Sequence, residues 1–276
     1  MARHVDAIRE RLYEAAADPQ ADVAHAALWI AAEEYPGLDP DPYLDYLARL
    51  AERVTARDAR GASGASRRRA MASEIFDRER FAGNADDYYD PRNSYLNDVI
   101  DRRLGIPITL AVIYLGVARR SDRSPVGLNT PGHFLILDEG VVIDPFHGAC
   151  EVAREVLLAQ IEKAGAPRPS ERLDWICRHP ADVSSILVRM LVNLRGNHLR
   201  RNDLHRALAA VDRLVHLDSE NPIWLRDRGA LYQRLDCPRA AAADLVAYLE
   251  HVPEDPEADG IRQMITRLSR DLPPLQ

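Results

Sequence analysis

The chain has 276 residues, 46% of them hydrophobic and 29% charged, which is typical of a globular protein with one large domain or two smaller ones. A formal net charge of −7 excludes a general electrostatic attraction to nucleic acid or to an anionic membrane. Three widely spaced cysteines, Cys150, Cys177 and Cys237, show no Cys-x-x-Cys pair and no zinc-ligand spacing, so we expect no metal and no cofactor.

The first part of the chain is predicted to be helical. Apolar residues recur three or four positions apart in residues 3–16, 21–34 and 42–56, which is the period of a helix with one buried face. Pro36-Gly37 and Pro40 interrupt the pattern between the second and third segments. We expect short helices that pack together and carry no chemistry.

Two further helices are predicted in the middle of the chain. Ser94 or Asn93 suits the N-cap of a helix over residues 95–103, and Gly105 is a typical residue for its end. Pro107 suits the first turn of the next helix, because its missing N–H would be unpaired there. Residues 107–120 are apolar on nearly every side, which predicts a helix buried at the centre of the fold.

A β-hairpin is predicted over residues 133–144, after a short strand at residues 126–129. Glu139-Gly140 is a plausible two-residue loop. That loop sets the register: Asp138 opposite Val141, Leu137 opposite Val142, Ile136 opposite Ile143 and Leu135 opposite Asp144. Because alternate and directly opposite residues share a face, His133 and Asp144 become diagonal neighbours within side-chain reach.

The C-terminal part contains an internal repeat with a period of about 34 residues, over residues 188–256. The matching positions are Leu191 and Leu225, Ala207 and Ala241, Val211 and Leu245, and Asp203 and Cys237. Gly229 is expected where two helices cross closely. The pattern resembles tetratricopeptide units. We therefore predict a first part over residues 1–180, which holds the helices and the hairpin described above, and a helical repeat region over residues 181–276.

Four motifs carry a resemblance to a known family. They are Asn93-Ser94-Tyr95-Leu96-Asn97, Arg103-x-Gly105-Ile106-Pro107-Ile108, Pro131-Gly132-His133-Phe134-Leu135 and Ile143-Asp144-Pro145-Phe146. Through them the chain resembles the bacterial SirB-type family, labelled as regulators of sirC expression, over most of residues 20–255. That family joins a transglutaminase-like core to tetratricopeptide-type repeats. The resemblance implies an α+β, mostly helical fold, with a papain-like core of a central helix packed on a small antiparallel sheet, followed by helical repeats.

In the transglutaminase-like superfamily, a Gly-x-Cys-x-x-x-Ala helix start precedes a strand with His and a strand with Asp-Pro. Gly105 and Ala111 match the helix start, and His133 and Asp144 match the other two catalytic positions. The nucleophile position falls on Pro107. Papain-like chemistry needs a Cys thiolate beside the His, so the scaffold of the reaction is predicted without its nucleophile.

Three hypotheses follow from the missing nucleophile. The chain is a non-catalytic protein that keeps a His133/Asp144 pocket and binds a protein or peptide partner through residues 188–256. Alternatively, it is a hydrolase or acyltransferase that uses His133 and Asp144 with another nucleophile, namely Thr109, Ser94 or Cys150. In the third hypothesis the His–Asp pair is purely structural.

The predicted pocket also includes residues that precede or begin the central helix: Asn93, Ser94, Asn97, Arg103, Pro107 and Thr109. The alternative roles are capping by Ser94 and solvent exposure of one of the two arginines, Arg102 and Arg103. The longest apolar run, residues 106–118, is shorter than the roughly 20 residues of a membrane span. Because the N-terminal residues also lack a signal-peptide pattern, we expect a cytoplasmic protein with no membrane or nucleic-acid partner.

Overall fold

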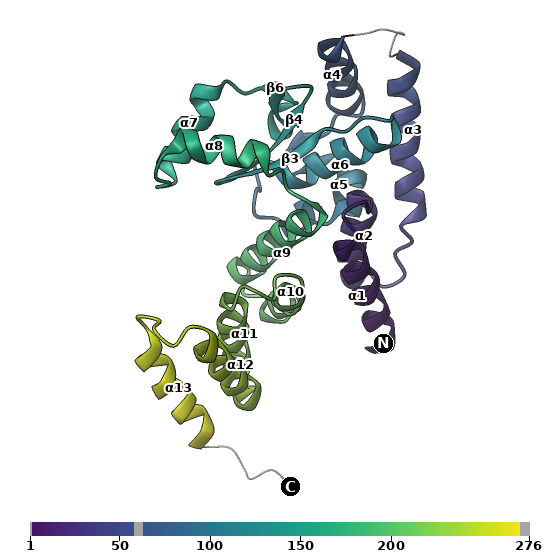
Figure 1. Ribbon diagram of the computed structural model, residues 1–276. Coiled ribbons are helices and arrows are strands. Elements are labelled where there is room, and N and C mark those ends of the chain that lie inside the picture. The colour runs from purple at the N-terminus through teal and green to yellow at the C-terminus, as the bar shows by residue number, and fades with distance from the viewer. Residues whose placement is uncertain (1, 58–62, 271–276) are drawn as a thin grey trace. The chain divides into compact units, whose positions relative to one another are not determined.

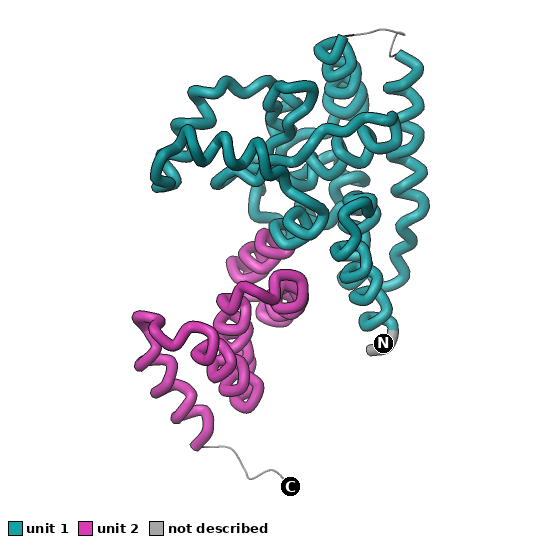
Figure 2. Tube along the Cα trace, viewed as in Figure 1, with its two compact units in different colours: residues 1–190 teal, residues 191–276 magenta. Residues whose placement is uncertain are grey.

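The computed structural model describes residues 2–57 and 63–270, and it divides into two compact units, residues 1–190 and residues 191–276 (Figure 2). The first unit combines helices with small sheets, and the second unit is helical. This confirms the predicted α+β fold, mostly helical, with a mixed core followed by repeats.

In the described ranges, the first unit combines eight complete α-helices with a small sheet (Figure 1). The helices are α1 (Ala2–Ala17), α2 (Val23–Glu34), α3 (Asp41–Arg57), α4 (Gly64–Ala72), α5 (Leu96–Arg102), α6 (Pro107–Arg120), α7 (Arg154–Lys163) and α8 (Pro169–Arg178). Three short helical segments are the π-helix η1 (Ser73–Arg78) and the 3-10 helices η2 (Pro91–Asn93) and η3 (Pro145–His147).

The main sheet has four antiparallel strands in the order β3 (Val126–Thr130), β4 (His133–Asp138), β5 (Val141–Asp144) and β6 (Cys150–Glu151). A separate two-stranded parallel sheet joins β1 (Ala82–Gly83) to β2 (Leu104–Gly105). Sequence periodicity did not indicate β1, β2 or β6, because two-residue strands carry no alternation to detect.

Helix α6 is the centre of the first unit, as its apolar sequence predicts. Almost all of its residues are buried, and it packs against α2, α3, β4 and η3. Pro107 is its first residue, where a missing N–H costs no hydrogen bond. Gly116 allows a close approach of α2, because a Cβ at this position would lie 3.0 Å from the Cβ of Ala24.

The hairpin has the predicted register. Ile136 pairs with Ile143, Leu137 with Val142, and Asp138 with Val141. Glu139 and Gly140 have φ values of +51° and +78°, as a two-residue turn with both central residues left-handed requires. The loop length and the hydrophobic pattern therefore fix which side chains of the two strands share a face.

The two faces of β4 meet different helices. On one face, Asp138 is buried and accepts a hydrogen bond of 2.5 Å from the Tyr114 hydroxyl of α6. On the other face, Leu135 joins Leu128 of β3 in a cluster with α7 and α8. Alternation along β4 places His133 on the face of Leu135. Helices α7 and α8 thus cover one face of the sheet, and α6 packs against the other face.

Two local predictions around α5 were wrong. Ser94 is not the N-cap: the helix begins one residue after Tyr95, and Ser94 is the C-cap of η2. Gly105 does not end α5, because the left-handed C-cap is Arg103, with φ +62°. Gly105 belongs to β2, and its missing side chain leaves room for the Thr109 hydroxyl, which a Cβ would approach to 2.8 Å.

The second unit begins within α9 (Val183–Arg200) and continues with α10 (Leu204–Leu217), α11 (Ile223–Arg234), α12 (Pro238–His251) and α13 (Ala258–Arg270). The repeat alignment agrees with these bounds, since Asp203 and Cys237 are the N-caps of α10 and α12. A Cβ on Gly229 would lie 3.0 Å from Leu245 Cγ, so α11 and α12 cross closely where predicted.

No helix in the described ranges is both long enough and apolar enough to cross a lipid bilayer.

Candidate functional site

A cluster of two imidazoles and one carboxylate lies at the end of the hairpin. His133 Nε2 is 2.9 Å from Asp144 Oδ2, and His147 Nδ1 is 2.7 Å from the same oxygen. His133 begins β4, Asp144 ends β5, and His147 ends η3. The structure therefore brings together the two residues that the register predicts to be neighbours, and adds His147 to them.

Asp144 is the fixed centre of this cluster. Its side chain is 10% exposed, and its Oδ1 accepts a hydrogen bond of 2.9 Å from the backbone N–H of Phe146. Burial alone would favour the neutral acid, but the hydrogen bonds from His133 and His147 outweigh it and hold the pKa of Asp144 below its ordinary value. Asp144 is therefore a carboxylate at neutral pH.

Phe146 supports both imidazole rings. Its ring meets that of His133 edge-on at 6.2 Å between centroids, and that of His147 at 5.2 Å. The other side of Phe146 rests on Gly83, where a Cβ would come within 2.5 Å of the ring. Tyr88 adds a further edge-on contact at 5.8 Å. The missing side chain of Gly83 thus leaves room for the Phe146 ring, which contacts both histidines.

His147 is the site residue that the sequence analysis missed. It is 62% exposed at its side chain, and its ring is nearly parallel to that of His133, with an angle of 12° between the planes. The signal in the sequence was Asp144-Pro145-Phe146-His147. An N-cap Asp followed by Pro starts a tight turn, which returns the third residue after the Asp to its carboxylate.

The start of α6 is built differently from the end of the hairpin. Pro107 is buried and offers neither a nucleophile nor an N–H. Thr109 is completely buried, accepts a hydrogen bond of 3.1 Å from the Ile106 N–H, and donates at 2.8 Å to the Asn93 carbonyl. Its hydroxyl also lies 3.1 Å from the Ile106 carbonyl. Thr109 therefore caps the helix and ties it to the preceding turn.

Residues 93–97, which join the end of η2 to the first turn of α5, are tied to this helix start through the Asn93 carbonyl. The Asn93 side chain is fully buried and donates at 2.7 Å to the Asp87 carbonyl, and it accepts at 3.0 Å from the Asn84 amide. Asn93 thereby holds the loop that carries Tyr88. Within the described residues, Ser94 Oγ and Asn97 Oδ1 are buried with no hydrogen-bond partner. None of these groups is hydrogen-bonded to His133.

Arg103 was predicted to share a pocket with His133, but the structure places it elsewhere. Its guanidinium lies over the ring of Tyr46 at 4.7 Å and over the ring of Phe81 at 4.8 Å. The backbone of Arg103 is left-handed, and its guanidinium also pairs at 3.4 Å with Glu79, the residue after η1. Sequence proximity to the α6 start was misleading because the C-cap reverses the direction of the chain.

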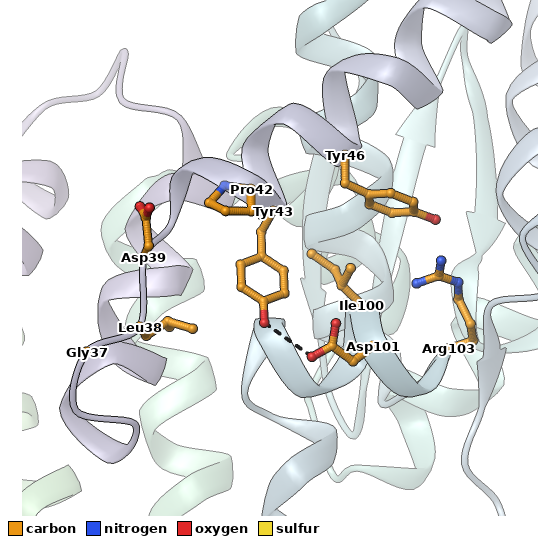
Figure 3. A pocket seen from close by; sticks show the side chains of 9 residues that line it. All are labelled: Gly37, Leu38, Asp39, Pro42, Tyr43, Tyr46, Ile100, Asp101 and Arg103. Carbon is orange, nitrogen blue, oxygen red and sulfur yellow. Dashed lines mark hydrogen bonds between the residues drawn. The ribbon is translucent and has the colours of Figure 1, made fainter.

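Arg103 instead lines a separate cavity of about 580 Å³ between α3 and α5 (Figure 3). Its lining residues are Gly37, Leu38, Asp39, Pro42, Tyr43, Tyr46, Ile100, Asp101 and Arg103. The Tyr43 hydroxyl donates to Asp101 at 3.2 Å, and the Tyr46 hydroxyl donates to Glu79 at 2.7 Å. Tyr43 and Asp101 therefore bind one another, while Tyr46 and Arg103 both bind Glu79, which is not a lining residue.

Cys150, an alternative nucleophile, is the residue opposite Asp144 on the edge strand β6. Partial burial and the negative charge of Asp144 raise the pKa of the Cys150 thiol. A raised pKa keeps the thiol protonated, whereas nucleophilic cysteines have a lowered pKa. The environment of Cys150 is thus the opposite of one that activates a thiolate.

Tyr88, which contacts Phe146, is influenced by the charge of Arg189 on α9. Burial lowers the pKa of Arg189, whose guanidinium donates to the Asn129 side chain at 2.7 Å. Burial also raises the pKa of Tyr88, and the charges of Arg189 and Asp144 act on it in opposite directions. These electrostatic interactions place Tyr88 in the field of both Arg189 and Asp144.

Comparison with known proteins gives consistent matches along the chain. The model of the transglutaminase-like superfamily matches residues 41–192, and a tetratricopeptide repeat model matches residues 194–266. A UPF0162 protein of Xylella fastidiosa strain 9a5c is 37% identical over 257 residues, which cover 89% of each chain.

More distant relatives carry related names. A UPF0162 protein of Pseudomonas aeruginosa is 32% identical over 80% of this chain and 81% of its own. Protein SirB1 of Salmonella typhimurium is 29% identical over 63% of this chain and 66% of its own. No solved structure matches.

Proposed function

We propose that this chain, which belongs to the UPF0162 (SirB-type) family of the transglutaminase-like superfamily, is a non-catalytic regulatory or interaction protein. Its first unit keeps a His133/Asp144 pocket without a nucleophile. Its tetratricopeptide repeats, over residues 188–256 and the helix that follows them, bind a protein or peptide partner.

The observation that supports this proposal most strongly is the construction of the α6 start. A thiolate enzyme of this superfamily needs a Cys there, and Pro107 supplies no side-chain nucleophile. Proline also removes a backbone N–H at the helix N-terminus, the kind of group that stabilises a developing oxyanion. Both the attacking group and one potential stabilising group are therefore missing from this position.

The other candidate nucleophiles give the hydrolase hypothesis little support. Thr109 uses its buried hydroxyl to cap α6, and Ser94 is completely buried. The Cys150 thiol has a raised pKa. Among the described residues, His133 forms no hydrogen bond with any of the three, although a nucleophile and its base are expected within hydrogen-bonding reach.

The second unit has the properties of a rigid binding scaffold. Arg228 of α11 pairs with Asp244 of α12 at 2.7 Å and with Asp212 of α10 at 3.0 Å. One guanidinium thus joins three consecutive helices. Val246 of α12 is 43% exposed, on a helix that packs against α11 and α13. We take Val246 as a marker of the partner-binding surface.

Catalysis is tested by assaying the purified full-length chain with amide and thioester substrates. We expect no turnover above buffer, and no difference between the native chain and His133→Ala. Turnover that is lost in His133→Ala, while the variant keeps its circular dichroism spectrum, would contradict the non-catalytic assignment and support the hydrolase hypothesis.

Partner binding is tested by affinity capture from a lysate of the source organism, with mass spectrometry as the readout. The test variant is Val246→Asp, and the matched control is Val156→Asp on α7, where the valine is 49% exposed in the first unit. We expect the captured protein to be lost only with Val246→Asp. Equal capture by both variants argues against α12 as the binding surface.

A further inference from the structure

We propose that His133, Asp144 and His147 form a binding site for a single divalent transition-metal ion. This inference is independent of the proposed partner binding by the repeats. It also departs from the sequence analysis, which found no metal-ligand spacing. The ligands come from the two ends of a hairpin and from the turn after it, so no short sequence motif records them.

The three side chains already converge as ligands of one ion. His133 Nε2 and His147 Nδ1 lie 2.9 and 2.7 Å from the same oxygen, Asp144 Oδ2, and all three atoms lie within 4.8 Å of one another. Two ligands at right angles, each about 2.1 Å from a metal ion, are about 3.0 Å apart. The distances from the carboxylate oxygen to the two ring nitrogens are therefore close to the distance between neighbouring ligands of one metal ion.

The carboxylate is held for this role by its other oxygen. Asp144 Oδ1 accepts the hydrogen bond of 2.9 Å from the Phe146 N–H, which leaves Oδ2 directed toward the two imidazoles. Outer hydrogen bonds of this kind orient metal-binding groups. The Phe146 ring, wedged against Gly83, contacts both imidazole rings and limits the movement of the more buried one, His133.

The remaining distance, between the two ring nitrogens, closes by movement of His147. Its side chain is 62% exposed, whereas those of His133 and Asp144 are 22% and 10% exposed. The site thus has two constrained ligands and one adaptable ligand on the solvent side. That arrangement gives an ion a route of entry and leaves coordination positions open to water.

The donor set selects the class of ion. Two imidazole nitrogens and one carboxylate oxygen suit Zn²⁺, Fe²⁺, Co²⁺ or Ni²⁺, whereas Mg²⁺ and Ca²⁺ prefer sites made only of oxygen. The distances from Asp144 Oδ2 to the two ring nitrogens fit six-coordinate ions somewhat better than tetrahedral Zn²⁺, whose ligands are about 3.4 Å apart. We therefore expect the affinity of the site for Co²⁺ and Ni²⁺, relative to Zn²⁺, to be at least as high as the general order of divalent-metal affinities predicts.

The competing explanation is that the two histidines only donate hydrogen bonds to Asp144. In that case both nitrogens keep their protons, and the buried carboxylate is satisfied without an ion. The two explanations differ in a measurable way, because metal binding displaces those protons and gives a defined stoichiometry.

The experiment uses the full-length chain, purified and freed of any affinity tag, dialysed against chelator and then titrated with Co²⁺. Binding is followed by isothermal titration calorimetry and by the visible absorption of Co²⁺. We expect one equivalent per chain. His147→Ala is expected to weaken the affinity by at least about tenfold, because it removes one of three ligands.

The matched control is His179→Ala. His179 is also exposed, and its Nδ1 lies 2.9 Å from the Trp175 carbonyl on α8 rather than near a second imidazole. This variant is expected to bind Co²⁺ like the native chain. Asp144→Asn, which keeps the shape of the side chain, provides a second ligand variant if His147→Ala does not fold. Absence of stoichiometric uptake, or equal uptake by both ligand variants, overturns the proposal.

Discussion

The end of the β4–β5 hairpin and the start of α6 are the two segments that the sequence resemblance predicts to form one site, and they differ in kind. At the hairpin, His133, Asp144 and His147 are polar, partly exposed and hydrogen-bonded to one another. At the helix start, Pro107 and Thr109 are buried. The hairpin end therefore presents polar groups toward solvent, whereas the hydroxyl at the helix start is used in hydrogen bonds within the fold.

The largest effect is expected from Thr109→Val, which tests whether the helix start is structural. The substitution leaves the Ile106 N–H and the Asn93 carbonyl without their hydroxyl partner in a buried region. An unpaired buried group costs about 1–3 kcal/mol, so we expect the free energy of unfolding to fall by about 3 kcal/mol in urea titrations. Thr55→Val, at an exposed position of α3, is the control and should change it by less than about 0.5 kcal/mol.

Gly83→Ala tests how the hairpin site is supported. A Cβ there comes within 2.5 Å of the Phe146 ring, so Phe146 must move away from both histidines. We expect a loss of about 2 kcal/mol in the free energy of unfolding, as for other overpacked sites. The nuclear magnetic resonance signals of the His133 and His147 rings should also shift.

The control for this variant is Gly196→Ala in α9. An added Cβ meets no atom within 4 Å there, and alanine is the better helix former, so no destabilisation is expected. Unchanged imidazole signals in Gly83→Ala would show that the histidines do not depend on Phe146.

A smaller effect is expected from Asp144→Asn, and it depends on pH. The pKa of Asp144 is lowered in the folded chain, so its carboxylate stabilises the fold above the ordinary unfolded pKa of about 3.9, and this contribution is lost as the pH falls through the folded value. At pH 7 we expect the variant to be less stable by about 1.5 kcal/mol. Below pH 4 its stability should fall less steeply than that of the native chain.

The measurement is urea unfolding between pH 2 and pH 7. Asp45→Asn, an exposed carboxylate on α3, is the comparison and should leave the steep acid dependence of the native chain in place. Identical acid slopes for the native chain and Asp144→Asn would mean that Asp144 is not held by the two histidines.

The sequence predicted the hairpin half of the site better than the helix half, for physical reasons. A two-residue turn and alternating apolar residues leave a single register, so His133 and Asp144 could be paired in advance. His147 was missed because its position depends on the 3-10 turn after β5, which has no period to detect. Arg103 was misplaced because a left-handed backbone residue redirects the chain, and only Gly and Asn usually signal that conformation.

The role of Gly105 illustrates a different limit. Local rules indicated a helix end, but the residue is needed for a tertiary reason: space for the Thr109 hydroxyl and for Val99 Cγ1, which a Cβ would approach to 3.0 Å. These contacts join three different elements, since Val99 lies on α5, Gly105 on β2 and Thr109 on α6. Propensity describes each segment separately, so it cannot reveal a requirement that arises only where segments meet.

The smallest effect on stability, and the sharpest test of the contrast between the two halves, comes from Pro107→Cys. Proline at the first helical position mainly reduces the freedom of the unfolded chain, so its loss should cost less than about 1 kcal/mol.

The thiol introduced by Pro107→Cys occupies a buried position at a helix N-terminus. If the helix start is closed, alkylation by iodoacetamide, followed by mass spectrometry, should be slower at residue 107 than at the exposed Cys150 of the same molecule. The opposite result, with faster alkylation at residue 107 that slows in a His133→Ala background, would mean that the imidazole reaches the helix start. The scaffold would then lack only its nucleophile, and the two halves would still form one active site.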